Sequence, residues 1–161
     1  MPCLANGDFE DGFDHNPPSE HGWPTVMTVG DTASIYIGYN ASLAHAGHSR
    51  LAMYNANAYS GYSQQTITNL PNGTYTLSAW FVSDDATGIP TLDLYATDYN
   101  AASLTDKSTT DIAPRPGFTA YVQFSVSDIV VTSNKLTIGV NVVANANKSV
   151  NVDDVTLVRT K

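Results

Sequence analysis

Hydrophobic and polar residues alternate along most of the chain, most clearly in residues 73–83, GTYTLSAWFVS. Every second residue of this segment is apolar and would share one face: Tyr75, Leu77, Ala79 and Phe81. A period of two residues predicts a β-strand with one face on a hydrophobic core. We expect further strands at 135–143 and at 118–126, the latter with Phe118, Ala120, Val122, Phe124 and Val126 inward. Shorter strands are expected at 25–29, 33–38, 49–54, 62–68, 91–97 and 149–159.

Turn-forming residues separate these segments, with Asn, Asp, Pro and Gly gathered at 69–73, 84–88, 114–117 and 145–148. Helical periodicity is hard to find, and residues 1–24 are expected to form a loop after one short strand. Eight to ten short strands at this spacing predict an all-β fold, a β-sandwich of the jelly-roll type with two antiparallel sheets. The length of 161 residues favours one domain over 1–161.

Charge is sparse and acidic, and it narrows the choice of partners. Only 14% of the residues are charged, and seven basic residues against fifteen acidic ones give a net charge of −8. The basic residues are scattered, so we expect neither nucleic acid nor a membrane surface as a partner. No apolar run approaches the roughly 20 residues of a spanning helix. Cys3 is the single cysteine, which excludes an intrachain disulfide and a thiolate metal site.

The sequence lacks a catalytic constellation, so we expect a protein that is not an enzyme. Glu10 and Glu20 are the two glutamates of the chain, and both precede the first long strand. Adjacent aspartates such as Asp153 and Asp154 point to opposite faces of a regular strand, so they do not form an acid/base pair by themselves. No metalloprotease, nucleophile-elbow or phosphate-loop motif is present.

Two acidic segments suggest a cation site. The first is NGDFEDG at 6–12, and the second is VNVDDVTL at 150–157. In the second segment Val152 and Val155 both suit the core only if the strand bulges at the aspartates. If the two chain ends meet, their carboxylates and nearby carbonyls would suit Ca²⁺, which prefers oxygen ligands. A pair of ordinary acidic turns is the alternative, and spacing alone does not separate the two.

Residues 57–80 hold four aromatic side chains and no charge, which is typical of a surface for a neutral ligand. A pyranose has an apolar C–H face that stacks on an aromatic ring and hydroxyls that bind amides or carboxylates. One arrangement is an open sheet face formed by Trp80, Tyr95 and Tyr121. The other is a loop site at the sandwich edge formed by Tyr54, Tyr59 and Tyr62, with Gln64 as a nearby polar group. The sequence leaves both arrangements open, and Trp23 is expected in the core.

Five short motifs occur in an order that resembles a known family: Asn-Gly-x-Phe-Glu at 6–10, Trp23, Gly-x-Ser-x-Leu at 47–51, QTI-x-x-LPNG-x-YTL-x-AW at 65–80 and Val-Asp-Asp-Val-x-Leu at 152–157. Together they resemble the galactose-binding-type jelly roll of many carbohydrate-binding modules. The central block is most similar to family sixty-one, the modules of bacterial endo-β-1,4-galactanases. The resemblance departs at Tyr54, where a Trp would be expected.

This resemblance implies a function and a metal. It implies non-catalytic binding of a neutral polysaccharide, β-1,4-galactan first and xylan or β-glucan next, which targets an attached glycoside hydrolase to its substrate. It implies a monomeric module of a secreted, extracellular bacterial protein, excised here from a longer chain. It also implies a structural calcium bound by Glu10, Asp153 and the region of His48, with Asp8 a further candidate. The alternative is a structural or adhesive β-sandwich domain of a cell-surface protein that has no sugar site.

Overall fold

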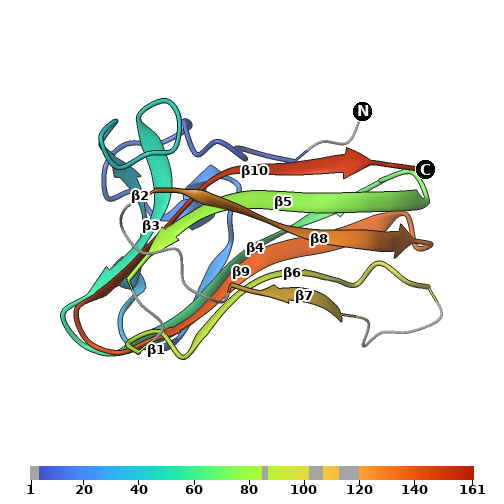
Figure 1. The fold of residues 1–161 in the computed structure, drawn as a ribbon. Coiled ribbons are helices and arrows are strands. Elements are labelled where there is room, and N and C mark those ends of the chain that lie inside the picture. The colour runs from blue at the N-terminus through green and yellow to red at the C-terminus, as the bar shows by residue number, and fades with distance from the viewer. Residues whose placement is uncertain (1–3, 85–86, 102–106, 113–119) are drawn as a thin grey trace.

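The structure is a computed structural model that describes residues 4–84, 87–101, 107–112 and 120–161, with the backbone alone at 107 and 108. Within these ranges ten strands form two antiparallel sheets of five, which pack face to face (Figure 1). The all-β sandwich that the sequence predicts is therefore confirmed. Sheet A has the order β2 (Ile35–Tyr39), β3 (Ser49–Asn55), β10 (Lys148–Arg159), β5 (Gly73–Ser83) and β8 (Val122–Val131). Sheet B has the order β1 (Thr25–Val29), β4 (Tyr59–Thr68), β9 (Lys135–Ala144), β6 (Thr91–Thr97) and β7 (Lys107–Asp111).

Alternation explains why these segments are strands. In β4 the odd-numbered residues from Tyr59 to Ile67 are buried, and the even-numbered ones face outward. The inward residues of both sheets form one apolar core, which includes Ile37, Leu77 and Ile138 at 0% exposure. Trp23 also belongs to this core, as the sequence predicts, since its side chain is 1% exposed.

Several expectations need correction. Strand β7 is not predicted, and the strand expected at 118–126 is observed at Val122–Val131, where Val122 is 42% exposed instead of inward. Phe118 and the turn at 114–117 lie outside the described residues. No strand is observed among residues 4–24, which contain the 3₁₀ helix η1 (Pro18–His21) and a single bridge from Asn16 to Ile37.

The bulge in β10 is confirmed. Pairing with β5 shifts register between Asp153 and Thr156, and Asp154 has φ +46°. Val152 and Val155 are consequently both buried, at 0% and 4% exposure. A second 3₁₀ helix, η2 (Thr32–Ser34), precedes β2. Among the described residues no helix is long and apolar enough to cross a membrane.

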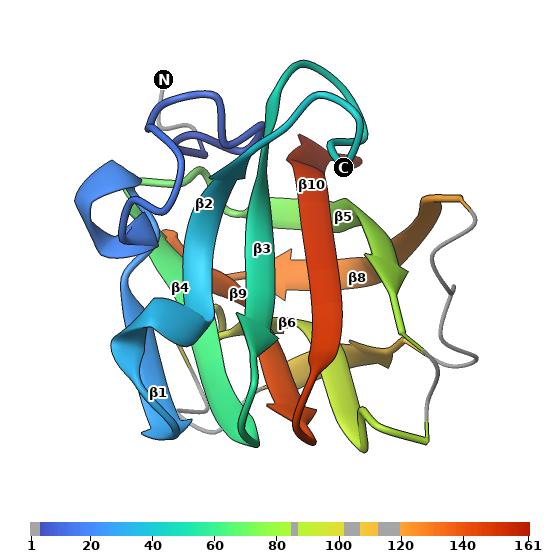
Figure 2. The same ribbon diagram turned by 90° about the vertical axis from the view of Figure 1, so that its left-hand side faces the viewer.

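Figure 2 shows β2, β3 and β10 side by side, with the β2–β3 loop arching over one end of sheet A. The N-terminal segment lies at that same end (Figure 2). The two acidic segments meet beside this loop, since the Val155 N–H donates to the Gly7 carbonyl at 2.8 Å, and Glu10 and Asp153 accept from loop N–H groups. Most of the predicted site residues lie on the outward faces of the two sheets or beside the β2–β3 loop.

Candidate functional site

The outer face of sheet B has a hollow over the middle of its central strand. Strand β9 lies between β4 and β6, and Gly139 pairs with Gln64 on one side and with Tyr95 on the other. Because Gly139 has no side chain, the side chain of its neighbour Tyr95 can lie across the strand at this position, which leaves the row low here. The hollow has a volume of about 250 Å³, and it is lined by Tyr62, Gln64, Tyr95, Thr97 and Asn141.

Tyr95 forms the floor of this hollow, which we call the sheet B hollow. A Cβ atom on Gly139 would lie 2.5 Å from the Tyr95 hydroxyl oxygen, so the phenol crosses β9 directly over the glycine. The hydroxyl then donates to Gln64 Oε1 on β4, at 2.7 Å. The side chain is 5% exposed, and burial raises its pKa, so the phenol remains a donor at neutral pH. Tyr95 therefore joins three strands and leaves a flat, partly aromatic floor.

Two amide side chains with hydrogen-bonding capacity left over within the described residues lie beside this floor. Gln64 accepts from Tyr95, but its amide NH₂ has no hydrogen-bond partner among the described residues. The side-chain amide of Asn141, between Tyr62 and Asp93 in the same row, has none in that part of the chain either. Tyr62 and Gln64 are half-buried, so their polar atoms reach solvent. Such groups exchange water for ligand hydroxyls without a loss of protein contacts.

The described charged side chains nearest the hollow are acidic. Asp93 and Asp111 face each other across β6 and β7, next to Asn141. Lys135, at the far end of β9, forms an ion pair with Asp98 at 3.0 Å. An anionic ligand would therefore meet repulsion here, while a neutral one would not.

Trp80 lies on the other sheet, which corrects the expected open face. It belongs to β5 of sheet A, whereas Tyr95 belongs to β6 of sheet B, so the two rings cannot form one surface. Trp80 is half-buried because the His45 ring stacks on it, with centroids 4.1 Å apart and planes at 15°. Tyr121 contacts the same imidazole edge-on at 5.3 Å, and its hydroxyl donates to the Leu43 carbonyl at 2.5 Å.

The three tyrosines of the expected loop site, Tyr54, Tyr59 and Tyr62, do not lie together in the structure. Tyr54 and Tyr59 belong to strands β3 and β4 instead of loops. Tyr59 is in the core at 0% exposure, with its hydroxyl donating to the Lys148 carbonyl, so it has no ring face for a ligand. Tyr54 is 41% exposed on the outer face of sheet A, and Tyr62 lies on the outer face of sheet B. Of the predicted residues, the sheet B hollow brings together Tyr62, Gln64 and Tyr95.

Two carboxylates from the chain ends hold the β2–β3 loop. Glu10 Oε1 accepts from the backbone N–H groups of His48 and Ser49, at 2.8 and 2.9 Å. Asp153 Oδ2 accepts from the N–H groups of His45 and Ala46, at 2.8 and 3.3 Å. Gly47 lies between these pairs with φ +63°, and a Cβ there would be 2.2 Å from Glu10 Oε1. The loop therefore passes close to both predicted metal ligands.

Asp153 is chemically unusual, because its carboxylate is 0% exposed and forms no ion pair with any described residue. Burial raises its pKa to about 7. A buried carboxylate with no cation is costly, so the oxygen donors here fit a hard cation. The described residues contain no cluster of three or more His, Cys, Asp or Glu side chains, so backbone carbonyls would have to complete the ligand set.

The other two predicted metal residues are peripheral. The His48 ring stacks on Tyr39 with centroids 5.5 Å apart, so the backbone near His48 is what approaches Glu10. Asp8 is exposed, and its Oδ1 accepts weakly from the Glu10 N–H at 3.4 Å. His45, three residues before His48, has its Nδ1 2.6 Å from Asp154 Oδ2.

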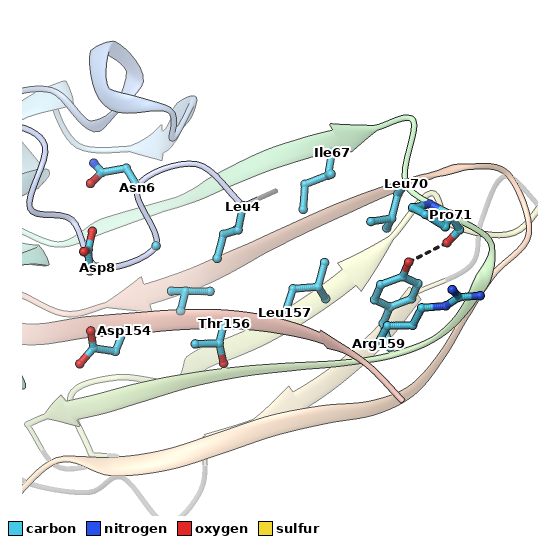
Figure 3. A pocket seen from close by; sticks show the side chains of 13 residues that line it. Leu4, Asn6, Asp8, Ile67, Leu70, Pro71, Asp154, Thr156, Leu157 and Arg159 are labelled. Carbon is cyan, nitrogen blue, oxygen red and sulfur yellow. Dashed lines mark hydrogen bonds between the residues drawn. The ribbon is translucent and has the colours of Figure 1, made fainter. Parts of the chain in front are cut away.

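A larger hollow of about 750 Å³ lies elsewhere, along the edge between the sheets. Figure 3 shows its lining, with Leu4, Ile67, Leu70 and Leu157 facing a common space. Tyr75 also lines this hollow, and its hydroxyl already donates to the Pro71 carbonyl at 2.7 Å. Arg159 donates to the carbonyls of Asn72 and Lys161. This space is mainly apolar, so size alone does not make it the better site for a polar ligand.

Sequence reasoning missed Asn141 and Gly139 at the sheet B hollow. It also gave no role to Arg50 and Asn151, which are hydrogen-bonded to each other on the outer face of sheet A. A glycine inside a strand often marks a close approach of other groups, so Gly139 was a usable signal. Arg50 is a lone basic residue within a predicted strand of a chain with little charge. Asn141 and Asn151 have no such signal, because outward polar residues are common on sheets.

No protein-family model and no curated protein matches this chain in sequence. Its fold does match solved structures. The structure of TmCBM61 in complex with β-1,4-galactotriose matches with a TM-score of 0.80 at 21% identity, over 99% of both chains. A family 16 carbohydrate-binding module matches with a TM-score of 0.61 at 19% identity, over 98% of this chain and 99% of the other. The K1 cleaved adhesin domain of Lys-gingipain from Porphyromonas gingivalis matches with 0.64 at 17% identity, over 96% of both.

These matches confirm that the chain has the jelly-roll fold of carbohydrate-binding modules, which the motif order predicts. The adhesin domain shows that proteins with another role share this fold. Function therefore has to be argued from the site itself.

Proposed function

We propose that this protein binds a neutral polysaccharide without cleaving it, at the sheet B hollow. The observation that carries the proposal is the meeting, around Gly139, of two tyrosine rings with two amides whose NH₂ groups have no hydrogen-bond partner among the described residues. This combination suits a pyranose, which needs a flat apolar contact and several hydrogen bonds at once.

Each lining residue has a distinct role in this proposal. The Tyr62 ring, half-buried at one end of the hollow, would stack on the C–H face of the sugar. The free NH₂ of Gln64 would donate to a hydroxyl, while Asn141 can both donate and accept. Tyr95 keeps Gln64 in place through its 2.7 Å hydrogen bond, so the amide is already oriented before the sugar arrives.

The acidic surroundings favour a neutral chain over one rich in uronic acids. Asp93 and Asp111 lie beside the hollow, and the formal net charge of the protein is −8. We place β-1,4-galactan first because the motifs in 62–80 resemble family sixty-one and because the fold matches TmCBM61, whose structure contains galactotriose. Xylan and β-glucan follow as the next candidates.

The proposal includes a structural Ca²⁺ at the β2–β3 loop. Glu10 and Asp153 would supply carboxylate oxygens, and backbone carbonyls near His48 would complete the site. The cation would neutralise the buried charge of Asp153 and so stabilise the loop. Asp8, exposed and close in sequence to Glu10, stays a further candidate ligand.

The proposal also includes the biological setting. We place the chain as a monomeric module of a secreted bacterial protein, where it brings an attached glycoside hydrolase to polysaccharide. Raising the local substrate concentration in this way needs no reaction at the module itself.

Affinity electrophoresis in gels containing β-1,4-galactan, xylan or β-glucan tests the sugar site. Wild-type protein is expected to be retarded most by galactan. The double variant Gln64→Ala/Asn141→Ala should lose retardation, because two hydrogen bonds of about 0.5–1.5 kcal/mol each disappear. Ser60→Ala is the matched control, since Ser60 is also outward on β4 but is not part of the hollow lining.

Absence of retardation in all three gels, with the protein folded, would contradict the proposal. That outcome would favour the alternative of a structural or adhesive β-sandwich. A reducing-sugar assay on the same polysaccharides is expected to show no cleavage products, and their appearance would contradict the non-catalytic role.

A further inference from the structure

We propose that the outer face of sheet A carries a second carbohydrate site, centred on Arg50 and separate from the sheet B hollow. This site adds a second binding face to the protein. It rests on the proposed function only for the class of ligand, a neutral sugar. The two faces lie on opposite sides of the sandwich, since they belong to different sheets (Figure 1).

Arg50 is the starting observation. It is outward on β3, yet it is 6% exposed, and its Nη1 has no hydrogen-bond partner within the described part of the chain. It also forms no ion pair there. A nearly buried guanidinium with one nitrogen lacking an acceptor is costly, so an acceptor supplied by a ligand at Nη1 would offset that cost.

The backbone and one amide hold the guanidinium in place. Gly38 pairs with Arg50 in the adjacent strand, and a Cβ there would lie 2.7 Å from Nη1 and 2.9 Å from Cζ. The Nε–H of Arg50 donates to Asn151 Oδ1 at 3.1 Å. Since Asn151 is itself 5% exposed, both side chains are fixed before any ligand binds.

Aromatic side chains lie on the same outward face of sheet A as this donor. Tyr36 and Ala52 pair in the neighbouring row, and Tyr54 on β3 is 41% exposed. The Tyr36 ring is held by stacking on His15, with centroids 4.7 Å apart and planes at 3°. Tyr121 reaches the β2–β3 loop through its hydrogen bond to Leu43. A fixed donor beside stacked and exposed rings has the composition that a pyranose requires.

The charges of this face select the class of ligand. Asp14, whose Oδ1 accepts from the Tyr39 N–H at 2.9 Å, lies at its rim. Asp153 is outward and pairs with Trp80, and Asp154 contacts the His45 ring. Asp14 and Asp154 balance the single guanidinium and disfavour an anion, so hydroxyl oxygens of a neutral sugar are the acceptors that fit. Two sugar sites on opposite faces would let one module bind two chains.

Isothermal titration calorimetry with β-1,4-galactotriose, xylotriose and cellotriose tests the second site. At least one of these sugars is expected to bind with a stoichiometry of two. Arg50→Met should remove one site and leave the other, whereas Gln64→Ala/Asn141→Ala should remove the complementary one. Tyr54→Ala, at an exposed position, is expected to weaken the sheet A site about tenfold and serves if Arg50→Met does not fold.

Tryptophan fluorescence shows on which face of the sandwich each sugar binds. Trp80 is half-buried on sheet A, whereas Trp23 is in the core at 1% exposure. Sugar at the sheet A site should shift the Trp80 emission even in Gln64→Ala/Asn141→Ala. In Arg50→Met, which keeps only the sheet B site, sugar should not shift the Trp80 emission.

A stoichiometry of one that Gln64→Ala/Asn141→Ala abolishes would overturn the second site and leave the proposed function standing. A single binding event that is weakened in Tyr54→Ala and Arg50→Met but unchanged in Gln64→Ala/Asn141→Ala would overturn the sheet B hollow and leave the sheet A site standing. No heat with any of the sugars, in folded protein, would overturn both.

Discussion

The two outward faces of the sandwich carry similar residues but differ in what covers them. On sheet B, Gly139 leaves space in the central strand, and Tyr95 fills only its floor. On sheet A, the β2–β3 loop crosses the end of the face and places His45 on Trp80. The comparison shows that an outward aromatic ring is available to a ligand only where its neighbours leave room.

The faces also differ in what stabilises them. The sheet B hollow is formed by strand residues in register, joined by the hydrogen bond between Tyr95 and Gln64. The sheet A face depends on a loop that Glu10 and Asp153 hold from the two ends of the chain. We therefore expect changes at the chain ends to affect sheet A and the overall stability, while leaving sugar binding on sheet B intact.

The largest expected effect is a loss of stability when Asp153, on sheet A, is replaced. Asp153→Asn would place an amide NH₂ or a weaker acceptor against backbone N–H groups that now donate to a carboxylate. We expect the free energy of unfolding to fall by about 2–4 kcal/mol, because buried donors lose partners. Asp93→Asn, on sheet B and half-buried, is the matched control and should change stability little. Urea unfolding followed by circular dichroism measures both.

Chelation tests the proposed cation in the same experiment. Wild-type protein in EDTA should lose stability, and added Ca²⁺ should restore it, whereas Asp153→Asn should respond to neither. Equal stability of the wild-type protein with EDTA and with Ca²⁺ would remove the calcium from the proposal without affecting the sheet B hollow.

The next effect concerns the space over Gly139. In Gly139→Ala the new methyl group would meet the Tyr95 hydroxyl at 2.5 Å and the Ser63 carbonyl oxygen at 2.7 Å. We expect a loss of about 1–3 kcal/mol of stability, typical of overpacking. Sugar binding on sheet B should fall at least tenfold, because the floor has to move. Val143→Ala, outward on the same strand, should retain wild-type affinity in calorimetry, and unchanged affinity in Gly139→Ala would show that the hollow is not the site.

Removing one aromatic ring from each face should have opposite effects on stability and on sugar binding. Trp80→Ala removes the stack with His45 and should cost about 1–2 kcal/mol of stability. It should leave the sheet B affinity unchanged. Tyr62→Ala should do the opposite, with little change in thermal unfolding and a loss of the sheet B binding heat. Loss of all sugar binding in Trp80→Ala alone would move the principal site to sheet A.

Alternation predicted which side of a strand each ring faces, but it could not predict the sheet. Trp80 and Tyr95 are both outward, as expected, yet they lie in different sheets because β5 pairs with β8 and β10 while β6 pairs with β7 and β9. Strand pairing depends on contacts between residues far apart in sequence, which local periodicity does not contain. For the same reason, Gln64 was predicted as a site residue while its partners Gly139 and Tyr95 were not joined to it.

The bulge at Asp153 was predictable because it follows from a local conflict. Val152 and Val155 both need burial, and an odd spacing allows this only if the strand departs from its period. The cover on Trp80 was not predictable, since it depends on His45 reaching Asp154 from 109 positions away. Local conflicts are visible in a sequence, whereas the placement of a loop on a distant strand is not.

The smallest expected effect tests whether Tyr95 acts by its ring or by its hydroxyl. Tyr95→Phe keeps the ring over Gly139 but leaves Gln64 Oε1 without its 2.7 Å donor. We expect a loss of about 0.5–1 kcal/mol of stability, the net value of one such hydrogen bond. Affinity on sheet B should fall only about twofold to threefold, because the released Gln64 side chain can still reach a sugar hydroxyl. Calorimetry of Tyr95→Phe beside Tyr95→Ala measures this, and equal losses in the two variants would show that orientation of Gln64, more than the aromatic floor, determines binding.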